Sequence, residues 1–274
     1  PEHTGRRPCP CRNARTGRLV RLGRHILAVA ALATVLSGCA SPRPKGPPPA
    51  VINRALATAP GVAQPSTIVA AEIAFARAAR EQGQWTAFKM FAAPGALLHG
   101  GNGPFAIEPW LATQADPPAA TQWEPRAVVI SCDGALAVSQ GRLTTPEGQV
   151  GNFVTVWERQ AGGEYRYVFD AGGLDVPQPP PRKPVEDGDI VVTSIDAVLG
   201  MVASCPRGGA EIPPPPAMPV GEDGKADARL SRDGTLRWRW EHRADGARYA
   251  MAEYFYEGRW LTAFEQTLLP TADE

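Results

Sequence analysis

Histidine and cysteine are scarce in this chain, which has four histidines and five cysteines among its 274 residues. Beyond residue 38 the only histidines are His99 and His242, and no Cys-x-x-Cys or His-x-x-x-His pattern occurs. Zinc sites need three or four such ligands, commonly at those spacings. A P-loop, a dinucleotide-binding fingerprint and a Gly-x-Ser-x-Gly elbow are also missing from the sequence. We therefore expect no metal site and no cofactor.

An apolar run long enough to cross a bilayer is missing from the N-terminal region. The run Ile26–Leu36 has eleven residues, which as a helix would rise about 16 Å, roughly half the thickness of a bilayer core. Four arginines lie shortly before this run, at positions 15, 18, 21 and 24. A basic segment, a short apolar run and small residues after it are typical of a secretory signal peptide.

The four residues Leu36-Ser37-Gly38-Cys39 resemble the bacterial lipoprotein signal, in which a peptidase cuts before the cysteine. The resemblance implies that residues 1–38 are removed and that Cys39 carries fatty acyl chains such as palmitate, which anchor the protein. Ala40 follows the cysteine, which in that family implies sorting to the outer membrane, facing the periplasm. The alternative is a core helix with a buried cysteine, but a core helix would not have arginines before it and prolines after it.

A tether follows the expected anchor. Five prolines lie between residues 41 and 50, and this density predicts an extended segment, so we interpret residues 39–61 as the lipidated cysteine and a proline-rich tether. The sequence begins at Pro1 and its first methionine is Met90. We expect residues 1 to about 18 to be an upstream fragment or an over-extended reading frame.

The whole chain has a formal net charge of zero, but its charges are unevenly distributed along the sequence. The first 38 residues hold seven of the 28 Lys/Arg and one of the 28 Asp/Glu, which leaves 21 basic and 27 acidic residues in the rest, a net charge of −6. A mildly acidic protein has no electrostatic footprint for nucleic acid. We expect no nucleic-acid partner.

Proline clusters divide the rest of the chain. Five prolines lie in 177–184 and five more in 213–219, and such segments continue neither a helix nor a central strand. We therefore expect a first domain at 62–175, a proline-rich linker at 176–184 and a C-terminal region at 185–271.

Helical periodicity opens the first domain. A helix capped by Ser66 and ended by Gly83 is predicted, with Val69, Ile73 and Ala76 on its buried side. Shorter helices are predicted at Trp85–Phe91 and Ile107–Ala115.

Alternating patterns follow the helices. Four strands separated by hairpin-turn pairs are predicted, at Arg126–Ser131, Ala135–Leu143, Val150–Arg159 and Glu164–Ala171. Helices followed by an antiparallel meander favour an α+β fold.

The order of a helix, "GQWTAFKMFAAPGALLHGG", "AIEPWL" and "GNFVTVWERQAGGEYRYVFDAGG" resembles the nuclear-transport-factor-2-like superfamily over residues 66–173. The similarity is greatest to its polyketide-cyclase-like and ketosteroid-isomerase-like branch. It implies helices packed in a curved antiparallel sheet, a cone with a pocket at its open end, here followed by a mainly β C-terminal region. Members include enzymes, binding proteins and dimerisation modules, so the fold does not supply a function.

The resemblance also implies candidate catalytic residues. Relatives that isomerise or cyclise use a buried carboxylate as base and a phenol or acid to hold the oxyanion, roles that Asp170 and Tyr167 would fill. Strand alternation places Asp170 opposite Tyr167 and Phe169, and the alternative is that Asp170 bonds the turn after its strand. His99 is either a base at the pocket mouth or a solvated loop histidine. Pro94 and Gly95 occupy places where members often have an acidic residue.

Several aromatic side chains fall where a pocket wall is expected. Either they line the pocket or they are ordinary core residues. These candidates are Trp85, Phe88, Trp110 and Trp157.

The C-terminal region has its own patterns. A short helix capped by Ser194 is predicted through Val202, and after residue 225 three turn pairs separate four alternating runs. Leu236, Trp238 and Trp240 share one face of this predicted meander, which is stable only when covered. The cover is the Ser194 helix, the first domain, or a second copy in a homodimer formed through the sheet.

The remaining cysteines are Cys132 and Cys205. Export places them in an oxidising compartment, where two thiols commonly form a disulfide. The alternative is two separately buried free cysteines.

Two functional hypotheses follow. The first is a lipid-anchored module that binds a small apolar ligand or an envelope protein. The second is a lipid-anchored isomerase, cyclase or dehydratase with Asp170 in its pocket. The missing acidic position favours the first.

Overall fold

The computed structural model describes residues 62–180, 197–206, 211–217 and 225–270, all within one compact unit of the chain. The expected signal peptide, Cys39, the tether 39–61, Ser194 and residues 181–184 of the linker lie outside the described residues. No helix in the described ranges is long and apolar enough to cross a membrane.

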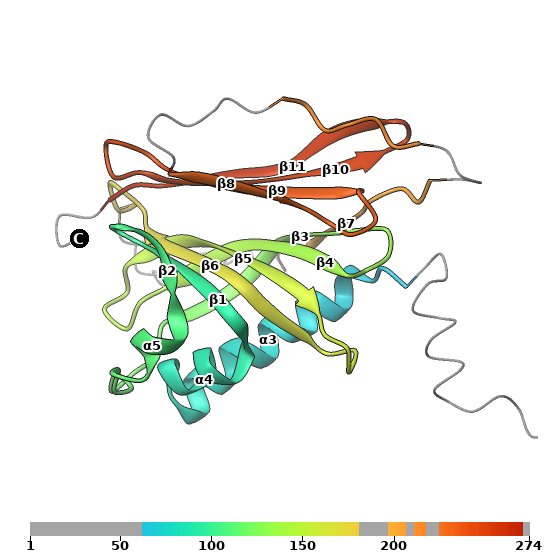
Figure 1. The fold of residues 1–274 in the computed structure, drawn as a ribbon. Coiled ribbons are helices and arrows are strands. Elements are labelled where there is room, and N and C mark those ends of the chain that lie inside the picture. Colours follow the sequence, from blue (N-terminus) through green and yellow to red (C-terminus); the bar gives the residue numbers. More distant parts are fainter. Residues whose placement is uncertain (1–61, 181–196, 207–210, 218–224, 271–274) are drawn as a thin grey trace, which may run out of the picture. The chain divides into compact units, whose positions relative to one another are not determined.

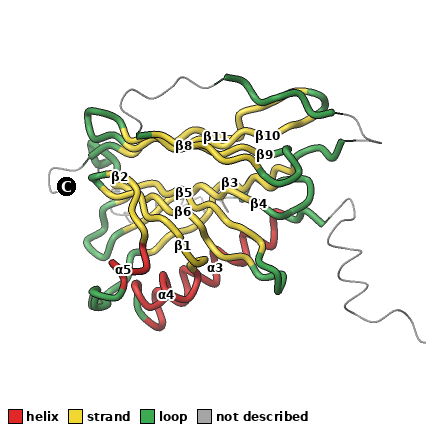
Figure 2. Tube along the Cα trace, viewed as in Figure 1, coloured by secondary structure: helices red, strands yellow, loops and turns green. Residues whose placement is uncertain are grey.

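Strands dominate the described residues, of which 47% are strand and 17% belong to three helices. The strands form a mixed seven-stranded sheet and a separate four-stranded sheet (Figures 1 and 2). The expected fold class, helices packed in a curved antiparallel cone, is therefore wrong. The sequence did not reveal that the large sheet has parallel pairs, β1 with β6 and β3 with β7, because those partners are distant in the chain.

The helices are α3 (Pro65–Gln82), α4 (Gln84–Phe91) and α5 (Ile107–Leu111). The N-cap of α3 is Gln64 rather than Ser66, because Pro65 already occupies the first turn. Asp116 caps α4 by accepting hydrogen bonds from the backbone N–H groups of Trp85 (2.6 Å) and Thr86 (3.0 Å). A Cβ on Gly83 would lie 2.3 Å from that carboxyl group, so the junction between the helices requires glycine.

The seven-stranded sheet has the order β2-β1-β6-β5-β4-β3-β7. Its strands are β1 (Ala92–Gly100), β2 (Gly103–Ala106), β3 (Gln122–Ile130), β4 (Leu136–Thr144), β5 (Val150–Arg159), β6 (Tyr165–Leu174) and β7 (Leu199–Val202). The four strands expected between residues 126 and 171 are β3 to β6. A helix was expected through Val202, but the structure has β7 there, an edge strand parallel to β3. The expectation was wrong because a short apolar run fits either a helix or a strand.

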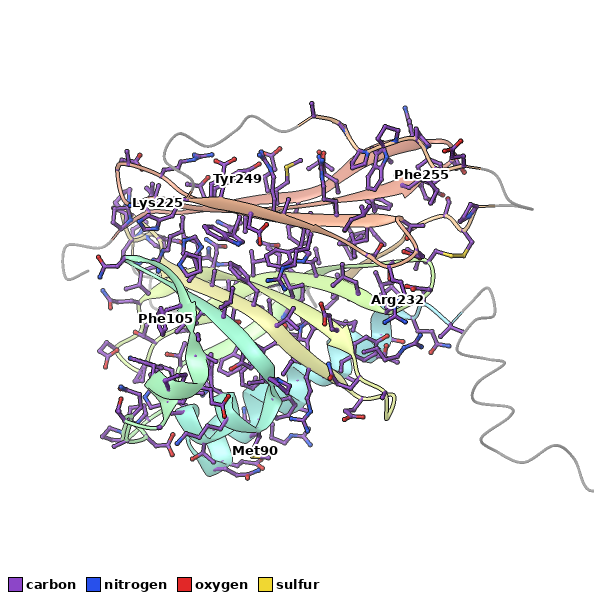
Figure 3. All side chains as sticks on the ribbon, viewed as in Figure 1. Met90, Phe105, Lys225, Arg232, Tyr249 and Phe255 are labelled. Atoms are coloured by element: carbon purple, nitrogen blue, oxygen red, sulfur yellow. A yellow bond between two sulfur atoms is a disulfide. The ribbon has the colours of Figure 1, made fainter. Side chains whose placement is uncertain are left out.

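The four-stranded sheet is a meander of order β11-β10-β9-β8. Its strands are β8 (Ala226–Leu230), β9 (Leu236–His242), β10 (Arg248–Tyr256) and β11 (Arg259–Leu268). Leu236 and Trp238 pack against residues of the large sheet, with the Trp238 and Phe169 rings 4.9 Å apart. Of the three covers considered for this face, the structure uses the first domain's sheet, and side chains fill the space between the sheets (Figure 3).

The two faces of the large sheet therefore have different partners. Helices α3 and α4 pack on one face, which we call the helix face, and the four-stranded sheet packs on the other, which we call the sheet face (Figure 1). Phe75 of α3 lies at the centre of the aromatic core on the helix face, within 6.1 Å of five other rings. Val129, Val156 and Phe169 belong to the core on the sheet face.

Two turns with the same pattern join the sheets. Ser131–Leu136 (SCDGAL) and Ser231–Leu236 (SRDGTL) share a Ser-x-Asp-Gly-x-Leu sequence, and in each the serine hydroxyl donates to the aspartate. The turns touch, because the Asp133 N–H donates to Asp233 Oδ2 at 2.8 Å. A disulfide between Cys132 and Cys205, with Cα atoms 5.1 Å apart, ties the first turn to the chain after β7.

Candidate functional site

A cavity of about 330 Å³ lies on the helix face of the large sheet. Helices α3 and α4 form one side of it, and strands β1 and β3 to β6 form the other. Its walls are mostly apolar and aromatic. The lining residues are Phe75, Gln84, Trp85, Phe88, Leu98, Thr121, Trp123, Leu143, Thr145, Phe153, Asp170, Gly172, Gly173 and Leu174.

Asp170 places a carboxyl group in this cavity wall. Its side chain is buried, with 8% of the residue exposed, and Oδ2 accepts a hydrogen bond from the Thr155 hydroxyl at 2.7 Å. The pKa of Asp170 is raised to about 7. Burial is the main cause, the hydrogen bond from Thr155 opposes the rise, and the nearby charge of Glu72 adds to it. The carboxyl group therefore changes protonation state close to neutral pH.

A β-bulge in β6 decides which way Asp170 faces. Trp157 of β5 pairs with Tyr167 and the next residue, Val156, pairs with Phe169, so Val168 has no partner in the ladder. The extra residue resets the alternation. Tyr167 and Asp170 consequently share the helix face, whereas Phe169 packs in the core of the sheet face. The expectation that Asp170 lies opposite Tyr167 is therefore wrong.

Glu72 of α3 is a second buried carboxyl group on the helix face, and it was not among the sequence candidates. It is fully buried and accepts hydrogen bonds from the Ser139 hydroxyl (2.5 Å), Trp157 Nε1 (2.9 Å) and Trp123 Nε1 (3.1 Å). Burial raises its pKa, while these hydrogen bonds oppose the rise.

The position of Glu72 in the helix was a usable signal. Glu72 lies four residues after Ile68 and three before Phe75, and both are buried, so the carboxylate interrupts an apolar stripe. The stripe assigned from the sequence was wrong in part, since Ile73 is 48% exposed. Burial of a charged residue on the inner side of a helix is unfavourable in free energy unless the residue is hydrogen-bonded. A carboxylate at such a position is therefore a candidate for a specific role.

Tyr167 is buried near Asp170, but its hydroxyl is already engaged. It donates to the backbone carbonyl of Phe88 at 2.9 Å, and the ring stacks on Phe75. Burial raises the pKa of Tyr167, and the charge of Asp170 raises it further. The phenol therefore braces α4 against β6 and is not positioned to hold an oxyanion in the cavity.

His99 does not face the cavity, so both sequence interpretations of it are wrong. It lies in β1 with 1% of its surface exposed, and its Nε2 is 3.2 Å from Nδ1 of His242 in β9. Alternation along β1 directs Leu98 to the cavity and His99 to the sheet face, against Trp240. The pKa of His99 is lowered to about 3, mainly by burial and in addition by the positive charges of His242 and Arg248.

Two of the four aromatic candidates line the cavity, Trp85 and Phe88. Trp157 is fully buried and donates a hydrogen bond to Glu72, and it does not line the cavity. Trp110 packs edge-on against Trp85 at 4.7 Å without lining the cavity.

No protein-family model matches this chain, and a search of curated proteins finds no significant match. The resemblance drawn from the sequence therefore stays a prediction. The chemistry rests on the cavity itself, where aromatic walls surround one carboxyl group that can either donate or accept a hydrogen bond near pH 7.

Proposed function

We propose that this chain is a lipid-anchored envelope protein whose described part binds a small apolar ligand. One observation carries the proposal: a cavity of about 330 Å³ with aromatic walls and a single buried carboxyl group. Small-molecule sites are concave, mostly apolar and of about 300–1,000 Å³, with a few polar groups that orient the ligand. The cavity has each of these properties.

The proposed location rests on the N-terminal sequence. A cleaved signal peptide and acyl chains on Cys39 would place the protein at the outer membrane, facing the periplasm. The disulfide between Cys132 and Cys205 supports export, because disulfides persist in oxidising compartments.

The proposal is tested by identifying small molecules that co-purify with the detergent-extracted chain, using mass spectrometry. Gly172 lines the cavity, and a Cβ there would meet Leu143 Cδ2 at 3.4 Å, so Gly172→Val fills part of the space. We expect a ligand with the wild-type chain that is lost from Gly172→Val and kept by the control Thr262→Val, at an exposed position of β11. A ligand retained equally by both variants would place binding elsewhere.

An isomerase, cyclase or dehydratase is the second candidate. It is favoured by the pKa of about 7 for Asp170, because a general base works best with a pKa near the operating pH. If it is correct, Asp170→Asn removes turnover of candidate carbonyl compounds, whereas Asp227→Asn, at an exposed site on β8, does not. Turnover that survives in Asp170→Asn eliminates this candidate.

A further inference from the structure

The charge of the cavity is of one sign. Asp170 is the only residue with an ionisable side chain among those that line it, and Lys, Arg and His are absent from the lining in the described part of the chain. Glu72, a second carboxyl group, acts on Asp170 from α3. A ligand with complementary charge is therefore a cation.

The walls suit a cation as well. The rings of Phe75 and Trp123 lie 4.8 Å apart, and those of Trp85 and Phe88 lie 5.4 Å apart, all four lining the cavity. Aromatic faces attract ammonium groups through the ring quadrupole, and the attraction grows when the site is desolvated. A cation placed here gains from both the rings and the carboxylate.

We propose that the ligand is an apolar amine whose ammonium group pairs with the Asp170 carboxylate while its hydrocarbon body lies among the aromatic rings. This inference rests on the proposed ligand-binding function and adds the chemical class of the ligand. The pairing uses a carboxylate already oriented by Thr155, which donates to Oδ2. It also relieves a cost, because a buried carboxylate without a counter-charge is unfavourable.

A second polar group in the wall accommodates a ligand that is not purely hydrocarbon. Thr145 lines the cavity, and its buried hydroxyl has no hydrogen-bond partner among the described residues. Buried hydroxyl groups normally have a partner. A second polar atom on the amine, at a distance from the ammonium group, would supply it.

The binding must depend on pH in a definite direction. The titratable groups acting on Asp170 are Glu72 from α3 and Tyr167 from its own strand, and β5 supplies the neutral Thr155. Only ionised Asp170 pairs with an ammonium group, so affinity falls as the pH drops below about 7, by up to about tenfold per pH unit. A neutral ligand that accepts a hydrogen bond from protonated Asp170 would show the opposite trend.

Two shape-matched probes separate these cases, namely 1-adamantylmethylamine and 1-adamantylmethanol. Binding of each to the full chain in a nonionic detergent is measured by calorimetry at pH 5 and pH 8. We expect the amine to bind at least about tenfold more tightly than the alcohol at pH 8, because only the ammonium group forms an ion pair with Asp170 and a cation–π contact with the rings. The preference should shrink at least about tenfold at pH 5.

Asp170→Asn keeps the shape of the side chain and removes its charge. We expect it to remove the amine preference and the pH dependence of amine binding, and Asp227→Asn to change neither. Circular dichroism checks the fold, and if Asp170→Asn does not fold, the pH series on the wild-type chain decides. Gly172→Val should weaken both probes.

Each result separates the two proposals. An alcohol that binds as tightly as the amine at pH 8 overturns the amine inference and leaves ligand binding intact. Failure of both probes, together with no ligand that depends on Gly172, overturns ligand binding in this cavity and the amine inference with it.

Discussion

The helix face and the sheet face of the large sheet share the same strands but differ in their packing and in their buried titratable groups. On the helix face, packing is incomplete and leaves a cavity beside two buried carboxyl groups, Asp170 and Glu72. On the sheet face, the strands pack on a second sheet, and the buried titratable pair there is His99 with His242. The carboxyl groups have raised pKa values and the histidines have lowered ones. The cavity therefore makes the helix face the place for the proposed ligand, and the close packing on the sheet face joins the two sheets.

The largest effect is expected from the disulfide that joins the turn between β3 and β4 to the chain after β7. Its removal in Cys132→Ala/Cys205→Ala frees a loop of 73 residues in the unfolded chain, which on the chain-entropy model lowers the free energy of unfolding by about 4 kcal/mol. Urea denaturation measures the loss. The same loss in wild type under reductant is the control, and an unchanged midpoint would show that packing alone joins β7 to the turn.

Glu72→Leu tests whether the helix face depends on its hidden carboxyl group. The change leaves the Ser139 hydroxyl and the indole N–H groups of Trp157 and Trp123 without their acceptor, and we expect a loss of about 3 kcal/mol in the free energy of unfolding. Glu72→Gln keeps an acceptor for Ser139 and Trp157 but turns an NH2 group toward Trp123 Nε1, so we expect a smaller loss, of about 1 kcal/mol. Equal losses in the two variants would show that the charge of Glu72, and not its hydrogen bonds, matters.

Asp170→Asn should reveal the pH dependence of the helix face. The pKa of Asp170 is about 7 in the folded chain against an ordinary 3.8, so the folded state holds this proton more tightly than the unfolded state. The contribution to stability is complete below about pH 4 and is lost as the pH rises to 7, at no more than about 1.4 kcal/mol per pH unit. Denaturation of the variant between pH 4 and 8 should lack that decline, and a decline that persists would assign it to another group.

His99→Phe should reveal the opposite dependence on the sheet face. The pKa of His99 is about 3 against an ordinary 6.5, so the unfolded chain takes up the proton first. The contribution of His99 to the free energy of unfolding is complete above about pH 6.5. It falls as the pH drops toward 3, by about 1 kcal/mol per pH unit. We expect the variant to lose most of this slope, with Asp170→Asn as the matched comparison. Between pH 4 and 6.5 the two slopes oppose each other in the wild type.

Local patterns predicted much of the fold. The strand Val150–Arg159 was predicted with the bounds that β5 has, because alternation and flanking turn pairs define it. The turn pairs Asp233-Gly234, Asp245-Gly246 and Glu257-Gly258 likewise located the hairpins of the second sheet. Strand β1 was missed, because Pro94 and Gly95 suggest a break and its parallel partner β6 is far away in the sequence.

The site was harder to predict than the strands. Asp170 and Trp85 were predicted from the sequence. The bulge at Val168 has no recognisable sequence pattern, and it reversed the face expected for Asp170. Glu72 was overlooked, although its place between Ile68 and Phe75 was visible. His99 was expected in a loop, because the following Gly100-Gly101 suggested one. Each miss concerns the direction of a side chain, which tertiary pairing decides.

The contact between the two Ser-x-Asp-Gly-x-Leu turns has a consequence for the order of folding. Each turn closes its own hairpin within six residues, which is a local and fast event. The hydrogen bond from Asp133 to Asp233 spans 100 residues and can form only when both hairpins already exist. The slow step in folding is therefore expected to be the docking of the two hairpins against each other.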